Sequence, residues 1–181
     1  MRIFVAGLSK SGKSTNSRYA ATIRGDIDHI GISKLLKARG GVLPVRTTLD
    51  AALNQIVATT ALKSLQLIKP YQILDGHALI ETEQGPFIVP DEFFTEIKPS
   101  LLIHIEERPG NLHQRRSRLG KHETPAELSA LALMEKAACR RIAVRQGIPL
   151  IEMLSPTPDE FANSLGQQLA QFSARNPVGG R

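Results

Sequence analysis

Residues 2–15, RIFVAGLSKSGKST, decide the fold. The apolar run 2–6 stops at Gly7, which is typical of a buried strand, and residues 14–23 read as a helix. Between them, Gly7 to Ser14 fits the spacing G-x-x-x-x-G-K-[ST], whose glycines let backbone N–H groups turn toward phosphate oxygens. Such a match arises by chance in roughly one chain of this length per hundred, and the flanking strand and helix make it rarer. The stretch therefore predicts a phosphate-binding loop rather than a glycine-rich turn with no ligand.

The loop assigns roles to individual side chains. Lys13 is expected to reach the β- and γ-phosphates of a nucleotide and to be catalytic, and the Ser14 hydroxyl is expected to bind Mg²⁺. With ATP as the nucleotide, we expect the binding residues to be Gly7, Ser9, Lys10, Ser11, Gly12, Lys13, Ser14 and Thr15.

Outside the loop, short apolar runs alternate with helical segments. Strands are expected at 2–6, 27–32, 71–75, 101–105 and 149–154, and helices at 14–23, 33–39, 47–68, 91–97, 125–146 and 159–172. This alternation predicts an α/β fold in which helices cover both faces of a parallel sheet. Residues 78–89 read as a hairpin or an extended loop around Gln84-Gly85-Pro86.

Helix boundaries and helix faces are also predicted. Ser33 suits an N-cap, and Thr124, Pro125 and Glu127 have the spacing of a capped helix start. In the helix expected at 47–68, apolar residues recur about every 3.6 positions, so this stripe is expected to pack inward: Leu49, Leu53, Ile56, Val57, Ala61, Leu65 and Ile68.

Two candidate site residues follow the third strand. Asp75 ends the apolar run YQILD, and a phosphate-loop protein needs an acid there to hold Mg²⁺ directly or through water. Asp75 is therefore the second expected metal-binding residue, beside Ser14. His77 points into the same site in one interpretation and is a hydrogen-bonded turn histidine in the other.

A basic cluster follows the fourth strand. Arg115, Arg116 and Arg118 come after the break at Pro109-Gly110, which we interpret as a hinge. Crowded guanidinium groups are costly without an anion, and over a transferred phosphoryl group they would offset its developing charge. We therefore expect all three to be catalytic; the alternative is an exposed basic face.

Composition narrows the class of protein. The 181 residues carry a net charge of +6, concentrated in basic blocks at 1–48 and 108–145 that are suited to an anionic ligand. No apolar run approaches the roughly 20 residues of a membrane span, and no secretory signal is visible. The single cysteine, Cys139, excludes an internal disulfide and reads as a buried small residue. We expect one domain over 1–175, a flexible tail at 176–181, a cytoplasmic location and no membrane partner.

Four segments together resemble the archaeal-type adenylate kinases and their bacterial relatives among the P-loop nucleoside monophosphate kinases. They are GLSKSGKST (7–15), HIGISKLLKARG (29–40), ILDGHALIETEQGPFIVPDE (73–92) and RRSRLGKHETPAELSALALMEKAACRRIAVRQGIPLIEM (115–153). The chain departs from the family at Lys136, where the resemblance leads us to expect an arginine.

The resemblance implies a P-loop NTPase fold with five parallel strands in the order 2-3-1-4-5 and a short arginine-bearing lid at about 108–123. It implies an acceptor-binding section at about 33–68, to which we assign Ser33, Arg46 and His77, and ATP with its base near the last strand. The reaction expected is transfer of a phosphoryl group from Mg-ATP to a nucleoside monophosphate. Two alternatives remain open: a kinase for another small metabolite, and a nucleotide-switched ATPase that acts on RNA or a ribonucleoprotein.

Overall fold

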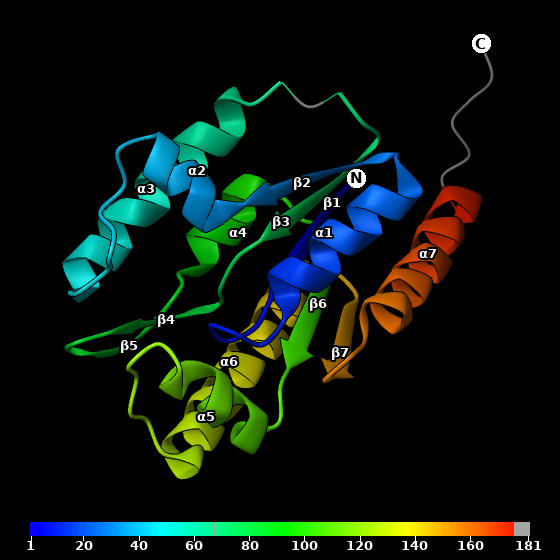
Figure 1. Ribbon diagram of the computed structural model, residues 1–181. Helices are drawn as coiled ribbons and strands as arrows, with labels where there is room; N and C mark the ends of the chain where they lie inside the picture. Colours follow the sequence, from blue (N-terminus) through cyan, green and yellow to red (C-terminus); the bar gives the residue numbers. More distant parts are fainter. Residues whose placement is uncertain (67, 176–181) are drawn as a thin grey trace.

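The computed structural model describes residues 1–66 and 68–175 and shows a central sheet between two layers of helices (Figure 1). The sheet has five parallel strands in the order β2-β3-β1-β6-β7. Their bounds are Arg2–Ala6 (β1), Ile27–Gly31 (β2), Tyr71–Asp75 (β3), Leu101–Glu106 (β6) and Leu150–Leu154 (β7). Counting only the sheet strands, this is the expected order 2-3-1-4-5, so the fold class and the topology are confirmed.

Seven helices and one hairpin complete the described chain. The helices are α1 (Lys13–Arg24), α2 (Ile32–Ala38), α3 (Thr48–Ser64), α4 (Asp91–Ile97), α5 (Pro109–Ser117), α6 (Pro125–Gln146) and α7 (Pro158–Arg175). The antiparallel strands β4 (Leu79–Thr82) and β5 (Gly85–Ile88) form the hairpin, with Thr82 opposite Gly85.

The alternation of side chains along β1 builds a core on each face of the sheet. Ile3 and Val5 pack with apolar residues of α1 and α7, whereas Phe4 and Ala6 pack with α3, α4 and α6. On the second face, Phe4 lies edge-on to Phe94, with ring centroids 5.1 Å apart. A strand buried on both faces reads as a continuous apolar run, which is why 2–6 was recognisable in the sequence.

The start of α6 follows the predicted capping pattern. The Thr124 side chain accepts a hydrogen bond from the Glu127 N–H, and the Glu127 carboxylate accepts one from the Thr124 N–H. A second reciprocal cap, formed by Thr47 and Asp50, starts α3. These caps satisfy backbone donors that have no partner within the helix.

Two helix boundaries differ from the expectation. The helix expected over 47–68 ends at Ser64, because Leu65 is extended (φ −71°, ψ 124°). Helix α2 begins at Ile32 with Gly31 at its N-cap, so Ser33 lies inside the helix and does not cap it.

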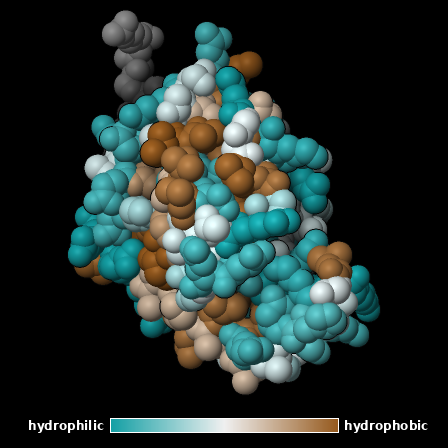
Figure 2. Space-filling view, turned by 90° about the vertical axis from the view of Figure 1, so that its left-hand side faces the viewer, coloured by the Kyte–Doolittle hydropathy of each residue, from teal (hydrophilic) through white to brown (hydrophobic). Residues whose placement is uncertain are grey.

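The predicted buried face of α3 is only partly right: Ala61 is buried, and Val57 and Leu65 pack partly buried against the core, but the other members of the stripe do not. Leu49, Leu53 and Ile56 are 65%, 45% and 65% exposed, and Ile68 beyond the helix is also exposed. The fully buried positions of α3 are Ala51, Asn54, Ala58, Ala61 and Leu62, of which only Ala61 belongs to the predicted stripe. Asn54 sits there because its amide bonds both the N–H and the C=O of Val42. Figure 2 shows apolar residues gathered among polar ones on the side of the molecule that carries this helix.

The break expected at Pro109-Gly110 is also wrong. Pro109 is the first residue of α5, where its missing N–H and fixed φ are tolerated, and Gly110 lies within the helix. The arginine cluster is therefore carried on a helix that begins directly after β6.

The remaining expectations from the sequence concern the cysteine, the C-terminal tail and membrane-spanning segments. Cys139 is fully buried on α6, as expected. The tail at 176–181 lies outside the described residues. Within the described ranges, no helix combines the length and the apolar character needed to cross a membrane.

Candidate functional site

The phosphate loop connects the end of β1 to the start of α1, at the carboxyl edge of the sheet. At Gly7 an added Cβ would lie 2.4 Å from the Ile105 carbonyl oxygen and 2.6 Å from Ser11 Oγ, so only glycine fits there. Gly12 has φ 96°, and at Lys10 a non-glycine residue adopts φ 71°. These residues form the tight turn that brings the loop back over the sheet.

The start of α1 is open toward a ligand. Its N-cap is Gly12, and no side chain caps the helix. The first N–H groups of a helix have no partner within it, and together with the helix dipole they favour an anion. The phosphate loop therefore has the local geometry of an anion site.

Lys13 is almost fully buried at the base of this loop. Its Nζ donates to the Leu8 carbonyl oxygen at 3.4 Å. Burial lowers the pKa of Lys13, and the charges of Asp75 and Glu135 oppose that shift. A buried ammonium group held by the loop is well placed to bind phosphate oxygens.

Asp75 lies at the end of β3 beside the loop, because Val5 of β1 and Asp75 are in register. Burial alone would raise the pKa of Asp75, but the His29 imidazole, the Ser14 hydroxyl and Lys13 outweigh burial and lower it. His29 Nε2 is 3.5 Å from Asp75 Oδ2. Asp75 Oδ1 is buried and has no hydrogen-bond partner in the described structure. The site thus holds an ionised carboxylate, one oxygen of which is buried without a partner in the described structure.

Two further titratable groups lie beneath the loop. Burial, reinforced by Lys13, lowers the pKa of His77 to about 3, so this imidazole is neutral at physiological pH. Glu135 of α6 is fully buried and accepts the Ala78 N–H at 3.1 Å; burial raises its pKa to about 7. His77 lies in the turn that follows Asp75, and Glu135 contacts the same turn at Ala78.

The larger pocket at the loop has a volume of about 630 Å³. It lies between the phosphate loop, α5 and the turn from β7 to α7, and its lining includes Lys10, Ser11, Gly12, Lys13, Ser14, Thr15, Asn16, Asn111, Arg115 and Ser155. Of the eight residues assigned to ATP, Lys10 to Thr15 line this pocket, whereas Gly7 and Ser9 do not. A volume within the range of about 300–1,000 Å³ suits a nucleotide-sized ligand.

Glu107 joins the elements around this pocket. Its carboxylate accepts hydrogen bonds from the Ser155 hydroxyl (2.6 Å) and from Asn111 Nδ2 (3.1 Å). Burial alone would raise the pKa of Glu107, but these hydrogen bonds and one from the Arg108 N–H outweigh burial and lower it. Glu107 therefore holds α5 against the loop after β7.

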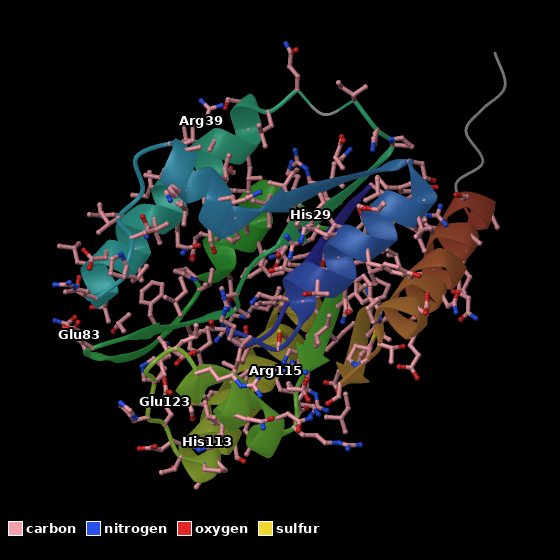
Figure 3. All side chains as sticks on the ribbon, in the orientation of Figure 1. His29, Arg39, Glu83, His113, Arg115 and Glu123 are labelled. Carbon is pink, nitrogen blue, oxygen red and sulfur yellow. The ribbon has the colours of Figure 1, made fainter. Side chains whose placement is uncertain are left out.

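The three candidate arginines lie in different surroundings. Arg115 Nη1 is 2.7 Å from Glu107 Oε2 and donates to the Lys10 carbonyl oxygen at 3.1 Å, which places it directly beside the phosphate loop (Figure 3). Arg116 is buried and forms ion pairs with Glu81 and Glu123. Arg118 is exposed at the end of α5. Successive helix positions face different directions, so one cluster in sequence becomes three separate positions in space.

A second, smaller pocket of about 240 Å³ lies on the other side of Lys13 and Ser14. Its remaining lining residues are Arg18, His29, Gly31, Ser33, Lys34, Asp75 and His77. Two of the three residues assigned to an acceptor, Ser33 and His77, line this pocket. Arg46 does not: it is exposed, with Nε 3.9 Å from Glu83 Oε1 at the hairpin.

Several residues at the two pockets were not assigned from the sequence. Glu107 and Ser155 carry the signal that marked Asp75, since both come shortly after a sheet strand. His29 lies within β2, and Glu135 lies within a long helix among apolar residues. No pattern in the sequence distinguishes these two from ordinary strand and helix residues.

Comparisons with known proteins support the fold. Neither the protein-family models nor the curated protein sequences contain a match to this chain. Solved structures do match over nearly the whole chain. Shikimate kinase from Acinetobacter baumannii, in complex with shikimate, is 18% identical with a TM-score of 0.59; the match covers 98% of this chain and 95% of that one.

Two further structures extend the comparison. The YorR protein from Bacillus subtilis, in complex with phosphorylated GDP, is 12% identical with a TM-score of 0.62, covering 96% and 98% of the two chains. A gluconokinase from Sinorhizobium meliloti is 16% identical with a TM-score of 0.58, covering 97% of each chain. At these identities the likeness establishes the fold alone, which this chain shares with the shikimate kinase and the gluconokinase.

Proposed function

We propose that this chain transfers the γ-phosphoryl group of Mg-ATP to a small-molecule acceptor. The observation that carries the proposal is the pair of pockets that share Lys13, Ser14 and Arg18. A phosphoryl donor and its acceptor must lie on opposite sides of the transferred group. Two adjacent pockets with the phosphate loop between them satisfy that requirement.

The chain's own residues would contribute position and charge. The loop N–H groups and Lys13 would bind the donor phosphates, and Arg115 would lie over the transferred group. Because Glu107, which lies between β6 and α5, holds Arg115 of α5, Arg115 enters the site already oriented. Gly7 would act through the turn rather than by contact, since it does not line the donor pocket.

The residues present fit a magnesium ion. Mg²⁺ prefers oxygen ligands and commonly takes one or two protein side chains, with phosphates and waters completing its shell. The Ser14 hydroxyl and the unpartnered Asp75 Oδ1 are such oxygens, and the two side chains are in contact. When bound, the ion would neutralise charge on the phosphates.

Two classes of acceptor are candidates. A nucleoside monophosphate is supported by the resemblance to archaeal-type adenylate kinases and by likeness to YorR and to a thymidylate kinase from Candida albicans. Another small metabolite is supported by likeness to shikimate kinase and gluconokinase.

We propose that residues 1–175 form one catalytic domain. We also propose a cytoplasmic location, because a chain whose only cysteine is Cys139 is suited to a compartment in which disulfides are rare.

The proposal is tested by following the label from [γ-³²P]ATP. The full chain is incubated with Mg²⁺ and a panel of acceptors, with and without RNA. We expect label in a small-molecule product and not only in inorganic phosphate. The Lys13→Ala variant should lose transfer while retaining its far-ultraviolet circular dichroism spectrum, because it lacks the buried cation that binds the donor phosphates.

The competing function predicts a different destination for the label. An ATPase that acts on RNA would release labelled inorganic phosphate, faster when RNA is present, with no labelled organic product. That result, or full transfer activity in the Lys13→Ala variant, would contradict the proposed function.

A further inference from the structure

The smaller pocket is lined entirely by polar residues and glycine. Its nine lining residues include no Phe, Tyr or Trp and no aliphatic side chain. A nucleobase is a flat group with apolar faces, and protein sites usually hold it by stacking or apolar contact. At about 240 Å³, the pocket is also below the range of about 300–1,000 Å³ typical of drug-sized ligands. Both features favour an acceptor smaller and more polar than a nucleotide.

Besides Lys13, two cations line this pocket, from different helices. Arg18 comes from α1, where its Nε donates to the Ser14 carbonyl oxygen, and Lys34 comes from α2. Neither has a carboxylate partner among residues 1–66 and 68–175. On α5 and α6, by contrast, Arg115, Lys136 and Arg140 each form an ion pair. The cations of the small pocket are therefore available to an anionic group on the ligand.

The floor of the pocket includes a hydrogen-bond acceptor that has no partner, the Asp75 carboxylate. Asp75 is only 5% exposed, and its Oδ1 has no hydrogen-bond partner in the described structure. An ionised carboxylate only accepts hydrogen bonds, and its two oxygens offer about four lone-pair sites. Asp75 would therefore have lone pairs both to help hold the metal ion and to accept a hydrogen bond from a hydroxyl group. His29, labelled on β2 in Figure 3, is 3.5 Å from Oδ2 and borders the same floor.

We propose that the acceptor is a small hydroxylated anion, such as a hydroxy acid or a sugar monophosphate, and not a nucleoside monophosphate. Its anionic group would lie between Arg18 and Lys34, and its hydroxyl group would face Asp75. This inference rests on the proposed function, and it specifies the substrate class of the same site.

The transfer step is balanced without a further reactant. The acceptor hydroxyl oxygen forms a bond to the γ-phosphorus of ATP, and the bond from that phosphorus to the bridging β,γ-oxygen breaks. ADP leaves with the electron pair of the broken bond. The hydroxyl proton is released to solvent.

The first experiment compares four groups of acceptors at the same concentration with the full chain and Mg-ATP. They are polyhydroxy monocarboxylates, sugar monophosphates, uncharged sugars and polyols, and nucleoside monophosphates. Products are identified by mass spectrometry. We expect product from one of the first two groups, and which of them reacts distinguishes a carboxylate from a phosphate ligand.

The outcomes separate the two proposals. Product from nucleoside monophosphates alone, or equal rates with uncharged polyols, would overturn the inference and leave the proposed kinase function standing. No product from any group would overturn the proposed function and the inference with it.

The second experiment tests the cations. Lys34→Gln should raise the acceptor KM about tenfold, or roughly 1.4 kcal/mol, with the ATP KM unchanged, because Lys34 lines only the small pocket. Arg18→Gln should raise both KM values, because Arg18 lines both pockets. The matched control is Arg39→Gln: Figure 3 shows Arg39 away from His29, at the far end of α2, and neither pocket includes it. An unchanged acceptor KM in Lys34→Gln would overturn the inference.

Discussion

At the scale of single residues, the fully buried carboxylate of Glu135 has a large effect on the stability of the folded chain. It accepts the Ala78 N–H through Oε1, while Oε2 has no hydrogen-bond partner in the described structure. Nearby Lys13 supplies the opposite charge, but burial dominates and raises the pKa of Glu135 from 4.5 to about 7. Burying a carboxylate this way costs stability whenever the group is ionised.

This residue predicts a dependence of stability on pH. Below pH 4.5, Glu135 is protonated in both the folded and the unfolded chain. As the pH rises from 4.5 through about 7, the unfolded chain loses the proton first, so the contribution of Glu135 to stability falls. The loss amounts to roughly 3 kcal/mol above pH 8.

The Glu135→Gln variant tests this prediction. Glutamine keeps an oxygen for the Ala78 N–H but carries no charge. The unfolding free energy of the variant, relative to the parent chain, should therefore increase by roughly 2–3 kcal/mol between pH 4.5 and pH 8. Urea unfolding followed by circular dichroism is the suitable measurement, because the chain has no tryptophan. A difference that does not vary with pH would show that Glu135 does not titrate as described.

At the scale of elements, the hairpin of β4 and β5 connects the start of α3 to α5. On one side, the Thr48 N–H donates to Gln84 Oε1, and the Glu83 N–H donates to the Arg46 carbonyl oxygen. On the other side, Glu81 of β4 pairs with the buried Arg116. Figure 3 shows Glu83 at the outer end of the hairpin and Glu123 in the segment between α5 and α6. Arg116 is thus held in a structural ion-pair cluster, whereas Arg115 faces the donor pocket.

The three arginines should therefore respond differently to substitution by alanine. Arg115→Ala should reduce kcat by on the order of 10³-fold with a much smaller change in ATP affinity, because the group acts mainly on the transition state. Arg116→Ala should lower the unfolding free energy by about 3–5 kcal/mol, because two carboxylates lose a buried partner. Arg118→Ala is the matched control and should change stability by no more than about 0.5 kcal/mol.

Steady-state kinetics and urea unfolding of the three variants distinguish these effects. A loss of less than about tenfold in kcat for Arg115→Ala would contradict its catalytic role. An unchanged stability in Arg116→Ala would contradict the structural role of the ion-pair cluster.

At the scale of the whole molecule, nucleotide binding should be visible as increased stability. A ligand that binds only the folded chain stabilises it by about 2.7 kcal/mol at 100 times its Kd. For a chain of this length, that corresponds to an increase in Tm of roughly 5–10 °C. We expect this shift in differential scanning calorimetry with Mg-ATP, and little or none in Lys13→Ala. An equal shift in both proteins would place the nucleotide away from the phosphate loop.

The sequence by itself determined the features that depend on neighbouring residues. The phosphate loop is one contiguous stretch, so its glycine spacing and its lysine were visible in residues 7–14. The cap at Thr124 and Glu127 spans four residues. The central strands β1, β3 and β6 appeared as mainly apolar runs because they are covered on both faces, and the strand order followed from the resemblance to a known family.

Only the tertiary structure decided which distant groups meet. The apolar stripe of α3 gave a buried face that is only partly right. The buried face of that helix consists mainly of alanines and the hydrogen-bonded Asn54, whereas Leu49 and Ile56 are exposed to solvent. Arg115 and Arg116 are adjacent in sequence, yet Arg115 pairs with Glu107 and Arg116 pairs with Glu81. These carboxylates come from other parts of the chain, so the two arginines have different surroundings. His29, Asp75 and Lys34 likewise become one pocket only through the register of β2 on β3 and the position of α2. The physical reason is that propensity and capping act within a few residues, whereas charge pairing and burial depend on the partner that packing supplies.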